Sequence, residues 1–108
     1  MTYSSLTEIH TLAKQAAIEA EAVFMEQYGE PAYCGFAWVK LMLDGRKPYT
    51  KELLKQGIIS KGWNNGYIIW NPTGNGTQSM DVKKAGAIAY ANVMQSFGIR
   101  AYAESRAD

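Results

Sequence analysis

The sequence contains few of the residues that most often carry out chemistry. Its 108 residues include one cysteine, Cys34, and one histidine, His10. A single cysteine forms no disulfide within the chain, and these two residues are too few for a structural zinc site, which needs four such ligands. They are also the only thiol and imidazole from which a nucleophile–base pair could be made. We therefore expect no catalytic site, no metal and no cofactor.

Long apolar runs and a strong excess of one charge are missing too. No run approaches the ~20 apolar residues of a membrane-spanning helix, and the polar residues after Met1 lack the basic segment of a signal peptide. Eleven Lys and Arg against ten Asp and Glu give a net charge of +1, whereas proteins that bind duplex DNA usually carry a clear basic excess. The expectation is a soluble, cytoplasmic single domain over residues 1–108, with neither a membrane nor duplex DNA as partner.

Hydrophobic periodicity and turn residues predict helices and strands in alternation. The helices are predicted over 5–29, 47–57 and 79–98, and the strands over 32–43, 67–70 and 99–106. Each predicted helix ends at a glycine, and Thr50 and Ser79 are predicted N-caps of the second and third helices. The order α-β-α-β-α-β predicts a compact α/β or α+β domain in which helices pack on a small three-stranded sheet. The directions of the strands stay open.

The first predicted helix carries small apolar residues at steps of three and four. The stripe consists of Leu6, Ile9, Ala13, Ala16, Ala20 and Val23. Such a stripe predicts the buried side of a helix, and its alanines suit close packing against another helix or a second copy of the chain. We therefore expect a homo-oligomer. In the strand at 32–43 both faces are largely apolar, which predicts a central strand that is covered on both sides.

A polar loop at 71–79 (NPTGNGTQS) joins the strand at 67–70 to the third predicted helix. Unpaired backbone N–H groups and the helix dipole favour an anion such as phosphate at a helix N-terminus. The loop matches neither a Walker loop nor the GxGxxG fingerprint. The alternative is a plain Asn-Pro turn followed by a helix cap.

The last predicted strand adds side chains that suit the same ligand. Arg100, Tyr102 and Arg106 fall on one of its faces; arginine pairs with phosphate, and tyrosine or tryptophan can stack on a base. The alternative is that Arg100 pairs with Glu104 on a solvated face. The predicted ligand is small and nucleotide-like or phosphorylated. Its predicted site is Trp70, Asn71, Thr73, Asn75, Thr77, Gln78, Ser79, Arg100, Tyr102 and Arg106.

Several segments resemble those of small bacteriophage-encoded accessory proteins. They are CGFAWV at 34–39, the stretch at 66–72, QSMDVKKAGA at 78–87 and the closing stretch at 98–108, which ends in SRAD; the N-terminal helix is not matched. The resemblance implies a phage product that acts in the bacterial cytoplasm. Phages encode small non-enzymatic proteins that sequester bacterial immune signalling nucleotides, often as homo-oligomers. The resemblance therefore favours a counter-defence function.

Two other functions stay open. A contiguous surface of Trp38, Trp63 and Trp70 would suit an inhibitor that binds a host enzyme or defence complex. A stacking face of Phe36, Trp38 and Tyr102 would suit a protein that binds single-stranded nucleic acid, with affinity that falls steeply as salt rises. An enzyme is the least favoured reading, and it would depend on Cys34.

Overall fold

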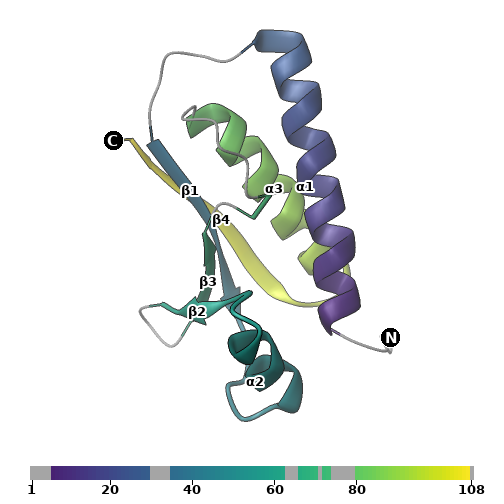
Figure 1. Ribbon diagram of the computed structural model, residues 1–108, viewed down its shortest axis with the longest axis vertical. Coiled ribbons are helices and arrows are strands. Elements are labelled where there is room, and N and C mark those ends of the chain that lie inside the picture. The colour runs from purple at the N-terminus through teal and green to yellow at the C-terminus, as the bar shows by residue number, and fades with distance from the viewer. Residues whose placement is uncertain (1–5, 30–34, 63–65, 71, 74–79, 108) are drawn as a thin grey trace.

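The computed structural model describes residues 6–29, 35–62, 66–70, 72–73 and 80–107. In these residues the helices are α1 (Leu6–Tyr28), α2 (Pro48–Lys55) and α3 (Met80–Ser96), and the strands are β1 (Gly35–Met42), β2 (Ser60–Lys61), β3 (Tyr67–Trp70) and β4 (Arg100–Ala107). Helices α1 and α3 lie side by side over the sheet, and α2 lies at the end of the molecule near β2 (Figure 1). Within the described residues, none of these helices has the length and apolarity to cross a membrane.

The sheet has four strands in the order β2-β3-β1-β4, and every neighbouring pair is antiparallel. The prediction of an α+β domain is thereby confirmed, while the prediction of three strands is wrong. The extra strand, β2, has two residues, too few for the alternation by which a strand is predicted. Strands β3 and β4 lie on either side of β1, so the central strand is the first in the chain.

The core lies between the sheet and the α1–α3 layer. From β1 it takes Ala37, Val39 and Leu41, all at most 1% exposed. The predicted stripe of α1 is partly wrong, because the buried positions are Ile9, Ala13, Ala17 and Glu21 and Val23 is 51% exposed. A step of four residues overshoots one turn by about 40°, so this stripe winds around α1, as expected where two helices cross at an angle.

The second face of β1 contradicts the prediction of a strand covered on both sides. Phe36 and Met42 alternate with the buried residues of β1 and are 42% and 36% exposed. Among the described elements, the helices pack on the opposite face (Figure 1). The apolar side chains that suggested a covered strand thus lie on an accessible surface.

The predicted helix ends agree with the structure. Gly29, Gly57 and Gly98 have φ of 70°, 75° and 83°, a left-handed conformation that glycine adopts without steric cost. The predicted cap of the second helix is wrong: α2 begins at Pro48, and Lys47 is in the N-cap position. Proline suits the first helical position because its φ is fixed near the helical value. Thr50 is instead fully buried, and the predicted cap Ser79 lies outside the described residues.

A histidine–tyrosine pair connects α1 to α3. His10 Nδ1 lies 2.6 Å from the Tyr90 hydroxyl, and Tyr90 is fully buried. Burial raises the pKa of the Tyr90 phenol, which therefore stays protonated and donates the hydrogen bond. Burial, and then the charge of Lys14, lower the pKa of His10 below its usual 6.5. The pair thus consists of a neutral imidazole that accepts at Nδ1 and carries its proton on Nε2.

This pair predicts a loss of stability on mild acidification. Because the pKa of His10 is lowered in the folded state, the unfolded chain binds more protons between pH 6.5 and that lower value. The free energy of unfolding should therefore fall as the pH drops below 6.5 towards the folded-state pKa. Urea unfolding of the wild-type chain and of His10→Gln from about pH 7.5 to about pH 5.5 checks this. An equal loss in both chains would show that His10 does not contribute.

Candidate functional site

One face of the sheet is left uncovered by the described helices, and several of the predicted side chains lie on it. Directly opposed residues in neighbouring strands point to the same face of a sheet, so the register fixes their arrangement. The rows are Trp70–Trp38–Glu104 and Ile68–Lys40–Tyr102, together with the pairs Phe36–Arg106 and Met42–Arg100. We call these ten residues the open face.

Aromatic rings form the centre of the open face. The rings of Trp38 and Trp70 are 5.0 Å apart and tilted by 50°, and Phe36 meets Trp70 edge to face at 6.5 Å. Trp38 is the anchor, since it is 8% exposed and its Nε1 donates to Glu104 at 2.8 Å. Trp70 and Tyr102 are 51% and 46% exposed. Trp70 is therefore an exposed ring that packs on Phe36 and Trp38, and Tyr102 is a second exposed ring on the same face.

Positive charge surrounds these rings. Arg100 and Arg106 are exposed, and Lys40 is half-buried between them. The alternative of an Arg100–Glu104 pair is not seen: the Glu104 carboxylate accepts from Trp38, and within the described residues the one salt bridge joins Arg46 to Asp44. Two guanidinium groups are thus available to an anion, although the whole chain has a net charge of only +1.

Lys83 of α3 supports one end of the open face. Its ammonium group donates to the Gly35 carbonyl at 3.1 Å and lies 5.6 Å from the centre of the Phe36 ring. At the other end, Arg100 and Tyr102 line a hollow of about 420 Å³ beside the turn from α3 to β4. The face therefore has cationic groups along its whole length.

The loop at 71–79 is only partly described. Asn71, Asn75, Thr77, Gln78 and Ser79, which were predicted to bind the ligand, lie outside the described residues. Thr73 is described, and its hydroxyl donates to both carboxyl oxygens of Glu21 at 2.9 and 3.0 Å. This side chain is therefore directed to α1. Of the ten predicted site residues, the structure brings together four, namely Trp70, Arg100, Tyr102 and Arg106.

Two features near these residues were not among the predicted site residues. Lys40 is the outward residue of β1 between Trp38 and Met42; alternation along the strand places it on this face, but no feature of the sequence indicated a role in the site. Glu21 is 2% exposed although it is ionisable. The signal for Glu21 was its place four residues after Ala17, in line with the buried stripe of α1. Glu21 ties α1 to the segment that follows β3, and so it positions the chain next to Trp70.

Other classes of site are less well supported. The described part of the chain holds no group of three or more His, Cys, Asp or Glu side chains that could bind a metal ion. His10 is engaged by Tyr90, and Cys34 lies outside the described residues. No family model, curated protein or solved structure matches this chain. The open face is therefore the best-supported candidate site of this chain.

Proposed function

We propose that this chain is a non-catalytic binding protein whose open face holds single-stranded nucleic acid. The observation that supports this most strongly is the pairing of exposed rings with unpaired guanidinium groups on one uncovered sheet face. Trp70 and Tyr102 offer stacking surface, and Arg100 and Arg106 offer donors to phosphate. Aromatic platforms flanked by cations are the usual means by which proteins bind single strands without reading their sequence.

The length of the face favours an extended ligand. Arg100 and Arg106 are six residues apart on β4, which at strand rise is a separation of about 20 Å. One mononucleotide is too short to reach both arginines, whereas several linked nucleotides can. The rings of Trp70 and Tyr102 lie in different rows of the sheet, so that two bases can stack at separate positions.

Fluorescence titration tests this proposal. Single-stranded oligonucleotides of increasing length should quench the tryptophan emission, with affinity that rises with length and falls as salt is added. Trp70→Ala should weaken binding about tenfold or more, since stacking contributes ~1–3 kcal/mol per base. Tyr28→Ala is the matched control, because Tyr28 is an exposed ring on α1. Undiminished binding by Trp70→Ala would rule out the open face as the site.

A second candidate is capture of a small phosphorylated nucleotide. Arg106 lies opposite Phe36, and Phe36 packs edge to face on Trp70, so one end of the face alone offers a ring and a guanidinium group. With the resemblance to phage accessory proteins, this candidate becomes sequestration of an immune signalling nucleotide in the bacterial cytoplasm, by a homo-oligomer packed through α1. A mononucleotide that binds as tightly as the oligonucleotides would favour it.

The same surface is also the one that a host protein would contact. Of the predicted tryptophan surface, Trp70 is exposed, Trp38 is buried and Trp63 lies outside the described residues. Phe36, Met42, Trp70 and Tyr102 form an exposed apolar set of the kind found at protein interfaces. If neither mononucleotides nor single strands bind, the nucleotide proposals are wrong and inhibition of a host protein becomes the leading function. The titration thus separates the three.

A further inference from the structure

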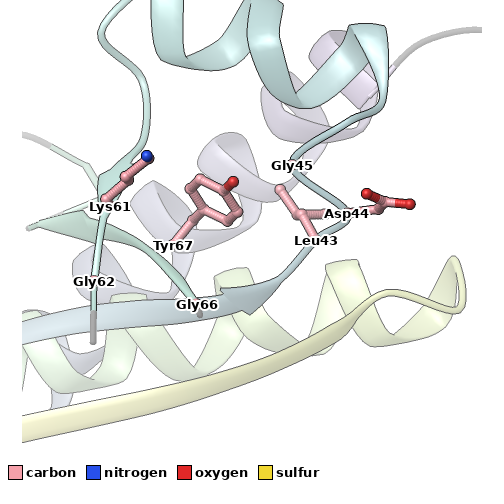
Figure 2. Close-up of a pocket in the computed structure, with 7 residues that line it drawn as sticks. All are labelled: Leu43, Asp44, Gly45, Lys61, Gly62, Gly66 and Tyr67. Atoms are coloured by element: carbon pink, nitrogen blue, oxygen red, sulfur yellow. The ribbon is translucent and has the colours of Figure 1, made fainter. Parts of the chain in front are cut away.

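A cavity on the other side of the sheet, under α2, has the features of a second binding site. Its volume is about 520 Å³, and it is lined by Leu43, Asp44, Gly45, Lys61, Gly62, Gly66 and Tyr67 (Figure 2). Cavities that hold small ligands commonly measure ~300–1,000 Å³. None of these residues belongs to the open face, so this site is independent of the function proposed above.

Tyr67 supplies the first polar group of the cavity. The residue is 8% exposed, and Figure 2 shows its hydroxyl directed towards Gly45. The hydroxyl has no hydrogen-bond partner among the described residues. A side chain at Gly45 would run into this hydroxyl oxygen, so glycine at that position makes room for the hydroxyl. A phenol placed in this way is available to donate to a ligand.

Lys61 supplies the second polar group. It is the direct cross-strand partner of Tyr67 between β2 and β3, and opposed residues point to the same face of a sheet. The Lys61 ammonium group is not in an ion pair with any described residue. Tyr67 and Lys61 therefore lie on the same face of the sheet, and both line the cavity with a donor group.

The acidic residue of the lining does not neutralise Lys61. Asp44 accepts from the backbone N–H of Arg46 at 2.9 Å and from its guanidinium group at 3.2 and 3.3 Å. These hydrogen bonds lower the pKa of Asp44 and keep it ionised. In Figure 2 its carboxylate points away from the Tyr67 ring. The charge of Asp44 is thus matched by Arg46, and the charge left over in the lining is the positive one of Lys61.

We propose that this cavity binds a small anion, a carboxylate or phosphate group, through the Tyr67 hydroxyl and the Lys61 ammonium group. Hydrogen bonds from a cation or a phenol to an anionic oxygen are short and strong. Gly45 contacts the Tyr67 hydroxyl, whereas a Cβ at Gly62 or Gly66 would point towards Ile68, Lys40 and Met42 of the open face, so these two glycines line the cavity with backbone atoms.

Titration of the isotope-labelled protein with inorganic phosphate, and separately with acetate, tests this proposal. Saturable NMR shifts are expected at the amides of Gly45, Gly62 and Gly66, and the tighter of the two anions identifies the group preferred. Lys61→Gln and Tyr67→Phe should each weaken binding about tenfold. Lys51→Gln, which removes a charge from the exposed side of α2, should leave the affinity unchanged.

Three results would overturn the proposal. The first is the absence of saturable shifts at these glycines. The second is an affinity of Tyr67→Phe and of Lys61→Gln for the anion that equals that of the wild-type chain, because the anion would then bind elsewhere. In that case, loss of binding in an Arg100→Gln/Arg106→Gln variant would identify the open face as the site. The third is a lowered melting temperature of Tyr67→Phe, since a hydroxyl that serves only the ligand should contribute nothing to folding.

Discussion

Removal of both arginines of the open face should weaken binding of single-stranded oligonucleotides about 100-fold. Each guanidinium group that contacts a phosphate contributes roughly 1.5–3 kcal/mol, or about tenfold or more in affinity, and the two groups are far enough apart for their effects to add. Arg100 and Arg106 are exposed and in no ion pair with a described residue. Arg100→Gln/Arg106→Gln should therefore keep the melting temperature of the wild-type chain.

The salt dependence gives a second readout of the same variant. For single strands, the slope of log affinity against log salt is about −0.7 per neutralised phosphate. Loss of two contacts should therefore flatten the slope by about 1.4. The matched control is Lys51→Gln/Lys55→Gln, which removes two positive charges from α2. If this control loses as much affinity as the arginine variant, binding depends on net charge and the open face is not the site.

The residues that β4 contributes to the open face could be predicted from the sequence, but the strands that lie beside β4, and their register, could not. Alternation along 99–106 placed Arg100, Tyr102 and Arg106 on one face because that strand is half-buried. Which residues of other strands join them depends on strand order and register. These follow from the pairing of Trp38 with both Trp70 and Glu104, contacts between residues far apart in the chain that no local pattern encodes.

The two-sided apolar pattern of β1 was misread for a related reason. Apolar residues on both faces indicate a strand buried on both sides only if other elements of the fold cover both faces. Trp38 shows the difference, because it is buried by neighbouring rings on an otherwise open face and its Nε1 is satisfied by Glu104. An aromatic cluster on an uncovered sheet face and aromatic residues of a core produce the same sequence pattern.

The burial of Glu21 near the end of α1 was not predicted, because glutamate is an ionisable residue. Glu21 continues the line of Ile9, Ala13 and Ala17 but was assigned to no buried face, since ionisable residues are rarely buried without a partner. Its partner Thr73 is 52 residues away in the chain. Gly86 of α3 also contacts Glu21, because a Cβ at this position would meet the Glu21 side chain. The sequence placed Gly86 in the third helix but assigned it no role. The arrangement depends on α1 and α3 crossing at this point, and helix periodicity alone does not locate a crossing.

The substitution Gly86→Ala is accordingly expected to destabilise the chain, the opposite of its usual effect in a helix. Glycine to alanine in a helix interior normally stabilises a protein by roughly 0.5–1 kcal/mol. At Gly86 a Cβ would lie 2.8 Å from both Cγ and Cδ of Glu21, which is well inside van der Waals contact. Glu21 is buried and cannot move away without breaking its hydrogen bonds from Thr73. Gly86→Ala should therefore lower the free energy of unfolding by about 3 kcal/mol, as measured by urea denaturation.

The double-mutant cycle with Glu21→Ala identifies the cause. Truncation of Glu21 removes the atoms that the new Cβ would meet, so in that background Gly86→Ala should be neutral or stabilising by up to ~1 kcal/mol, the ordinary helix preference. The double mutant should then be more stable than the sum of the two single effects predicts, and the difference should be about as large as the loss caused by Gly86→Ala alone. A Gly86→Ala chain that is as stable as the wild type would show that α1 and α3 are not held at this distance. The tie from Glu21 to the segment after Trp70 would then no longer explain how that segment is positioned.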